Sequence, residues 1–99
     1  MIKVKVKKNN ISILGHADFA DYGQDIVCAA VSGVVITSIE AIASFNSNAV
    51  DVNKKTDKLE IIIKDDDLVT NKLIENMLSC LKDIEKRYSK NIKIFDKEE

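Results

Sequence analysis

Residues 15 to 32 read GHADFADYGQDIVCAAVS and join two kinds of secondary structure. The apolar run just before them, Ile11 to Leu14, is typical of a strand that ends near Gly15. From Ile26 to Ser44 the chain stays apolar without a proline, and these nineteen residues far exceed a usual strand. We therefore predict a strand, a loop over residues 17–24, and a long helix whose N-cap is Asp25.

The rest of the chain supplies strands and one further helix. Ile2 to Lys7 alternates apolar residues with lysines, which predicts a strand with one solvated face, paired as a hairpin with the strand that follows. Later segments predict two strands, an amphipathic helix and a last strand: Ala49–Asn53, Lys58–Ile63, Leu68–Tyr88 and Ile92–Phe95. The order ββαββαβ predicts the α/β class (α+β type): one domain, residues 1–99, with a mixed or antiparallel sheet and two helices as a two-layer sandwich.

The helix over residues 26–44 is apolar nearly all round, and Glu40 is its single charged residue. Such a helix is central in a fold or lies in a membrane. Polar residues interrupt it and amphipathic strands flank it, so we expect no membrane. Its small residues Ala29, Ala30 and Gly33 suit close packing against a sheet or a twin subunit.

Composition excludes several classes of function. The formal charge is −1, which gives no general reason to expect direct nucleic-acid binding, and we interpret Lys3, Lys5 and Lys7 as a solvated strand face. Two cysteines and one histidine make neither a disulfide framework nor a usual zinc site, so we expect no metal and no cofactor. The first ten residues, MIKVKVKKNN, lack the apolar core of a signal peptide, and we expect a cytoplasmic protein.

Aspartates at residues 65–67 are interpreted as helix-capping residues, because no further ligands follow at the spacing of a metal-binding loop. Cys80 falls among the apolar positions of the helix over residues 68–88, which predicts an inert core thiol.

Nucleophilic thiol chemistry is one function that Cys28 and His16 can serve. With Asp25 as N-cap, Cys28 occupies the third helical position, where backbone N–H groups and the helix dipole favour a thiolate. The same amides can stabilise an oxyanion, and His16 can accept and return the proton. Asp25, Asp18 and Asp21 are candidates to orient the imidazole.

On spacing alone the assignment stays open. A single Cys in an apolar helix is more often a small core residue, and a lone His at a strand end is more often structural. Ser32, one turn after Cys28, can hydrogen-bond a substrate or only its own helix.

The segment Gly15-His16-Ala17, followed by YGQDIVCAAVS over residues 22–32, resembles the ribosomal-processing cysteine protease family called Prp. The hallmark of that family is a Gly-His pair, then Gly-x-Asp-Ile-Val-Cys-Ala and Val-Ser. Members are small α/β proteins, usually homodimers, that remove the N-terminal extension of large-subunit ribosomal protein L-twenty-seven during ribosome assembly. Length and element order are similar across nearly the whole chain.

The resemblance implies a set of roles for residues of this chain. His16 and Cys28 take the catalytic positions, and Asp25 and Ser32 take supporting ones. The segment between them corresponds to a substrate loop: Ala17, Asp18, Phe19, Ala20, Asp21, Tyr22, Gly23 and Gln24. Family members cut after a pair of aromatic residues, which implies an apolar subsite near the thiol, with Phe19, Tyr22 and Phe45 as candidate wall residues.

Two other functions remain as alternatives. A non-catalytic ribosome-associated module would bind through Lys3, Lys5 and Lys7 and would need neither His16 nor Cys28. A thiol redox protein would pair Cys28 with Cys80, although the chain has no Cys-x-x-Cys motif.

Overall fold

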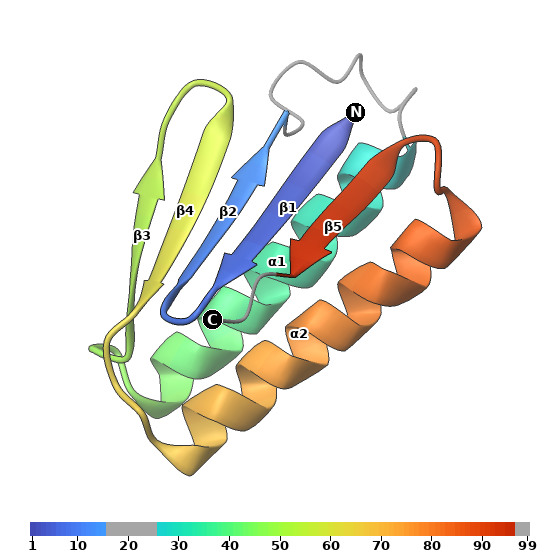
Figure 1. Ribbon diagram of the computed structural model, residues 1–99. Coiled ribbons are helices and arrows are strands. Elements are labelled where there is room, and N and C mark those ends of the chain that lie inside the picture. The colour runs from blue at the N-terminus through green and yellow to red at the C-terminus, as the bar shows by residue number, and fades with distance from the viewer. Residues whose placement is uncertain (16–25, 97–99) are drawn as a thin grey trace.

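The structure is a computed structural model and describes residues 1–15 and 26–96. Its elements follow the predicted order ββαββαβ (Figure 1). They are β1 (Ile2–Lys7), β2 (Asn10–Leu14), α1 (Ile26–Phe45), β3 (Val50–Lys54), β4 (Lys58–Ile63), α2 (Leu68–Arg87) and β5 (Ile92–Asp96).

The five strands form one mixed sheet in the order β3-β4-β2-β1-β5. β1 pairs antiparallel with β2 and parallel with β5, and the pairs β2–β4 and β3–β4 are antiparallel. Both helices lie side by side on one face of the sheet, and no helix or strand of the described residues covers the other face (Figure 1). The predicted two-layer α/β architecture is confirmed.

The core lies between the sheet and the two helices. In β1, Ile2, Val4 and Val6 are buried against the helices while the lysines between them are exposed, as the alternation predicts. α1 and α2 contribute the helical half of the core: Val27, Cys28, Val31, Val35, Ile42, Ile74, Met77 and Leu81. Strand β1 therefore presents its apolar side to the helices and its lysines to solvent.

α1 buries only one of its faces, and here the expectation of a helix enclosed by the fold is wrong. Ile26, Ile36 and Phe45 are each more than half exposed. The small residues Ala29, Ala30 and Gly33 also lie on the exposed side, so the sheet does not cover them. By length and composition α1 could cross a membrane, with a mean hydropathy of 2.1, and 28% of that stretch is buried inside the fold.

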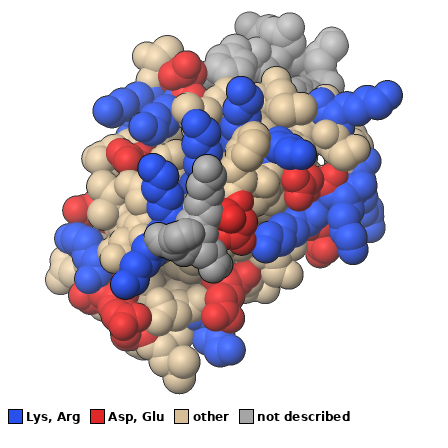
Figure 2. Space-filling model, in the orientation of Figure 1, with Lys and Arg blue, Asp and Glu red and all other residues tan. Residues whose placement is uncertain are grey.

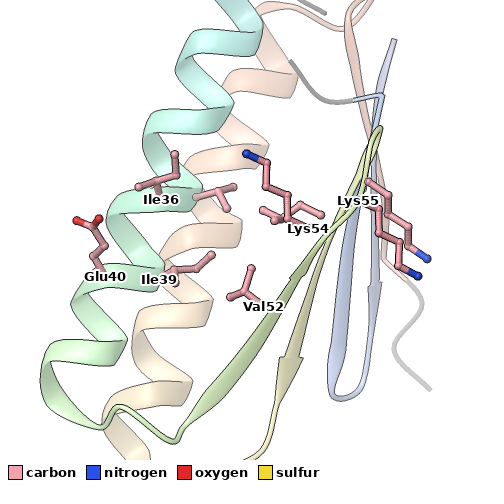
Figure 3. Close-up of a pocket in the computed structure, with 9 residues that line it drawn as sticks. Ile36, Ile39, Glu40, Val52, Lys54 and Lys55 are labelled. Atoms are coloured by element: carbon pink, nitrogen blue, oxygen red, sulfur yellow. The ribbon is translucent and has the colours of Figure 1, made fainter. Parts of the chain in front are cut away.

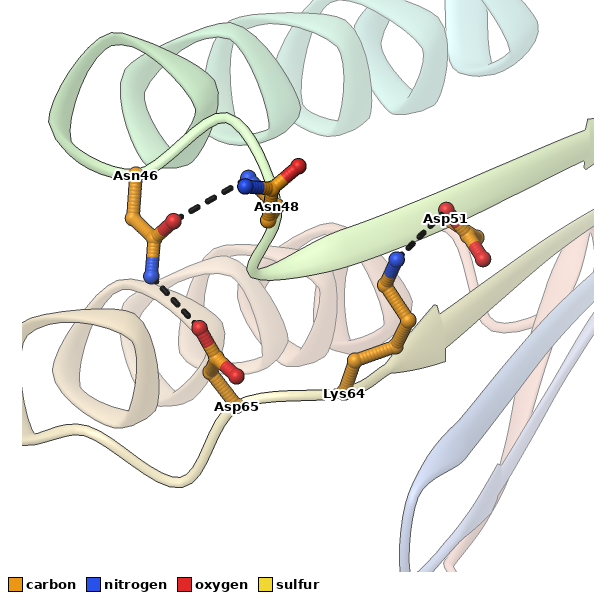
Figure 4. A network of polar contacts seen from close by, with 5 residues as sticks. All are labelled: Asn46, Asn48, Asp51, Lys64 and Asp65. Atoms are coloured by element: carbon orange, nitrogen blue, oxygen red, sulfur yellow. Dashed lines mark hydrogen bonds and ion pairs between the residues drawn. The ribbon is translucent and has the colours of Figure 1, made fainter.

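A small polar network fixes the end of α1 (Figure 4). The side-chain amide of Asn46 donates to Asp65 Oδ2 at 2.7 Å, and Asn46 Oδ1 accepts from the backbone N–H of Asn48 at 3.0 Å. Beside it, Lys64 Nζ lies 3.2 Å from Asp51 Oδ1. These contacts tie the α1–β3 connection to the segment that leads from β4 into α2.

Asp67 caps α2, as predicted. Its carboxylate accepts from the backbone N–H of Thr70 at 2.8 Å and from the Thr70 hydroxyl at 2.9 Å. The backbone hydrogen bond is the main reason that the pKa of Asp67 lies below its ordinary value of 3.8.

We predict that Asp67→Ala lowers the free energy of unfolding at pH 7, because Thr70 N–H loses its acceptor. Urea denaturation measures this value, and Asp67→Asn is the control that keeps an acceptor. The pKa of Asp67 is lower in the folded protein than in the unfolded chain. The ionised carboxylate therefore contributes its full stability above the ordinary pKa, and this contribution is lost as the pH falls through the pKa of the folded protein. Equal unfolding free energies for the two variants would contradict the assignment.

Candidate active site at the start of α1

The carboxyl end of β2 is held in place by Gly15. Its φ is +71°, and a Cβ atom there would lie 2.6 Å from the carbonyl oxygen of Met1. Its N–H donates to the carbonyl of Asp57 at 3.0 Å. A side chain at position 15 would therefore strain the backbone and collide with the start of β1. His16, Asp25 and the predicted substrate loop over residues 17–24 lie outside the described residues.

Cys28 is the third residue of α1, because the helix begins at Ile26 as the sequence predicts. Its side chain is 3% exposed and belongs to the core between α1 and the sheet. N–H groups in the first turn of a helix have no acceptor within that helix and point toward its N-terminal end. The positive helix end at this position favours a thiolate and an oxyanion, and a surrounding that excludes water strengthens the hydrogen bonds that an oxyanion accepts.

The face of α1 that carries Cys28 continues toward the middle of the helix. Ser32 follows four residues later and is half-buried, and Val35 follows after three more. This spacing places the three side chains on one helix face.

An apolar groove opens between α1 and β3, and we call it the α1–β3 groove (Figure 3). Ile36 and Ile39 face Val52 across it, Lys54 extends toward α1, and Glu40 points away. Its volume is about 290 Å³, and its lining comes from α1, β3, β4 and the turn between the strands: Val35, Ile36, Ile39, Glu40, Val52, Lys54, Lys55, Lys58 and Leu59.

The groove exists because the helices do not fully cover the edge strand β3. Ile36 is 53% exposed and Val52 is 40% exposed, although both are apolar. Sequence reasoning missed these two residues. The sequence gives little indication that they line a groove, because an exposed isoleucine cannot be distinguished from a buried one before the order of the strands is known.

The groove lies within reach of a peptide held at Cys28. Ile36 follows Cys28 by eight residues, which is about 12 Å along a helix axis. An extended peptide advances about 3.3 Å per residue, so a side chain about three or four residues from the reacting carbonyl can enter the groove. Phe45, by contrast, is about 26 Å along the axis from Cys28 and is too distant to line a subsite beside the thiol.

The two cysteines are not joined by a disulfide. Cys28 lies in α1, and Cys80 is half-buried in α2 rather than part of the core that was predicted for it. The redox alternative therefore gains no support. Within residues 1–15 and 26–96, no three His, Cys, Asp or Glu side chains are grouped so as to hold a metal ion.

Comparison with known proteins gives one consistent result. The sequence model described as "Cysteine protease Prp" matches residues 1–93. The ribosomal processing cysteine protease Prp of Staphylococcus aureus strain Mu50 is 33% identical over 91 residues, which cover 89% of this chain and 86% of that protein. The Prp of Bacillus subtilis is 28% identical over 108 residues, covering 95% and 96% of the two chains.

Solved structures of a Prp protease have the same fold as this chain. A crystal structure of the S. aureus protease Prp with a covalently linked product peptide has a TM-score of 0.88 and 31% identity, and the match covers 98% of this chain and 100% of that one. A second structure of that protease, with a substrate peptide, has a TM-score of 0.87, 30% identity and the same coverage. A buried thiol in the first turn of α1, the matching fold and the matched sequence together place this chain in the cysteine protease Prp family.

Proposed function

We propose that this protein is a cytoplasmic cysteine endopeptidase that removes the N-terminal extension of large-subunit ribosomal protein L-twenty-seven during ribosome assembly. The observation that carries the proposal is the position of Cys28 at the third residue of α1, in a chain of a cysteine protease family. The S. aureus relative, solved with a substrate peptide, supports a peptide substrate.

The proposed reaction divides amide hydrolysis into two steps. His16 takes the proton of Cys28, and the sulfur attacks the carbonyl carbon to form a carbon–sulfur bond. Backbone amides of the first turn stabilise the oxyanion. The carbon–nitrogen bond then breaks, and His16 returns the proton to the leaving amine. Water, deprotonated by His16, attacks the thioester and releases the thiol, with Asp25 and Ser32 in supporting roles.

We predict that Cys28→Ala lowers kcat for an extended substrate peptide by about a thousandfold or more, because the nucleophile is gone. Peptide cleavage measured by mass spectrometry tests this, and circular dichroism checks that the variant stays folded. Cys80→Ala is the matched control and should keep full activity. His16→Ala should also lose almost all turnover, while Asp25→Asn should only reduce it. Full activity in Cys28→Ala would end the proposal.

The α1–β3 groove is proposed as the apolar subsite of this enzyme. Most of its α1 lining is apolar. It begins at Val35, which lies two helical turns beyond Cys28 on the same face of α1. Removing an apolar side chain from water contributes about 1.5–3 kcal/mol, enough to select a peptide by one large side chain.

Substitution of Ile36 by aspartate tests the subsite. We predict that Ile36→Asp lowers kcat/KM about tenfold or more, chiefly through a higher KM, because a carboxylate then lies in the apolar groove. Ile36 is already exposed, so the fold should tolerate the change. Phe45→Asp, at the far end of the same helix, is the control and should leave KM unchanged. Equal KM values for the two variants would place the subsite elsewhere.

A homodimer is also proposed, and the exposed side of α1 is the surface that suits it. Ala29, Ala30 and Gly33 lie on that side, and a Cβ atom added at Gly33 would meet nothing within 4 Å. The sheet packs against the opposite face of α1, so these small residues are not in contact with it. We propose a second copy, which would bury Ile26 as well, as the partner of this surface.

A further inference from the structure

The open face of the sheet gathers lysines that are far apart in the sequence. Strand pairing places Lys58, Leu14, Lys3 and Lys93 in one row across β4, β2, β1 and β5. The next row contains Glu60, Ser12, Lys5 and Phe95. With Lys7, these rows form a surface that we call the lysine face: Lys3, Lys5, Lys7, Lys58 and Lys93. Figure 2 shows lysines along this side of the molecule.

Among the described residues, the lysines of this face have like-charged neighbours and no ion-pair partner. Lys3 is paired in register with Lys93 on the adjacent strand, and like charges directly opposite each other are destabilising. In the part of the chain that the structure describes, the ion pairs are Lys64–Asp51, Lys72–Glu75 and Lys82–Asp96, so no lysine of the face takes part. This arrangement persists although the whole chain has a net charge of −1.

Glu60 is the one carboxylate in the two rows, and it lies on β4, separated by β2 from Lys3 on β1 and further from Lys93 on β5. Its pKa is lowered, first by the hydrogen bond that the Asn10 amide donates at 2.9 Å and further by the charge of Lys58. Glu60 therefore offsets Lys58, and Lys3, Lys5, Lys7 and Lys93 remain as a local charge of +4.

Two shallow hollows lie next to each other on this face. One, of about 370 Å³, is lined by Lys3, Lys5, Val6, Lys7 and Phe95. The other, of about 310 Å³, lies toward β4 and shares Lys5 and Lys7. The aromatic ring of Phe95 is half-buried beside Lys5, so an aromatic surface lies among the ammonium groups.

We propose that the lysine face binds the phosphate backbone of RNA. Alternate residues of a strand are about 6.6 Å apart, so the three lysines of β1 can each meet a phosphate of an extended strand. An aromatic ring among lysines on an open sheet is the arrangement on which bases stack. A membrane surface is less suited, because most of the exposed large apolar side chains among the described residues lie on α1 and α2: Ile26, Ile36, Phe45, Leu68 and Val69.

The position of the lysine face gives it a role beyond peptide cleavage. Apart from Lys58, which also lines the edge of the α1–β3 groove, it is on the side of the sheet away from the helices, whereas Cys28 and the rest of the groove are on the helical side. RNA and peptide can therefore be bound at the same time, which would hold the protease on an RNA-containing particle while it cuts a protein of that particle.

The test measures binding of a fluorescein-labelled 20-nucleotide single-stranded RNA by anisotropy, with the full chain at 50 to 200 mM salt. If the four lysines that Glu60 does not offset contact phosphates, the affinity should fall about fiftyfold over this range, with a log–log slope of about −2.8. The combined variant Lys3→Gln, Lys5→Gln, Lys7→Gln should bind at least about tenfold more weakly at 50 mM salt, with a slope of about −0.7.

The matched control carries Lys72→Gln, Lys86→Gln and Lys90→Gln, which remove the same charge in and just beyond α2. It should keep the affinity and slope of the native chain. Equal losses in the two triple variants, or a native slope near zero, would overturn the proposal. So would lysine-dependent binding to phosphatidylserine vesicles without binding to RNA. Cleavage of a short peptide should be unchanged in the Lys3, Lys5, Lys7 variant, so this test does not depend on the proposed peptidase.

Discussion

The packing of α1 against one face of the sheet is the contact on which the other features depend. It buries Val27, Cys28 and Val31 at the start of the helix, and so places a thiol at a positive helix end shielded from water. Because two helices on one face do not fully cover five strands, β3 is left partly open and the α1–β3 groove forms. Neither α1 nor α2 covers the opposite face, where the lysines of β1 are exposed.

Much of this architecture could be predicted, because local patterns determine the elements. Alternation in β1, the proline-free apolar run of α1 and the cap at Asp67 each specify structure within a few residues. The bounds of β1 and β4 agree with prediction, and those of the other elements differ by one residue or so. The position of Cys28 in α1 followed from the same local reasoning, and the family followed from the motif around it.

What could not be predicted depends on contacts between distant segments. The order of the strands brings Lys93 beside Lys3, and this pairing cannot be predicted from the periodicity of either strand. The exposure of Ile36 and Val52 depends on which strand lies at the edge, so the groove was not foreseen. The prediction of a core thiol at Cys80 was wrong for a similar reason: its helical spacing is apolar, but the contacts of α2 leave it half-buried. The roles of His16 and Asp25 stay predictions.

The two cysteines allow a direct test of whether the start of α1 activates a thiol. Cys80 is the more exposed, so alkylation governed by access alone would modify it first. The measurement is the rate of iodoacetamide modification at each cysteine between pH 5 and 9, read by peptide mass spectrometry. We predict that Cys28 reacts faster at neutral pH, more slowly in acid, and much more slowly in His16→Ala. Faster reaction of Cys80 throughout, with Cys28 inert, would contradict a nucleophilic thiol at the start of α1.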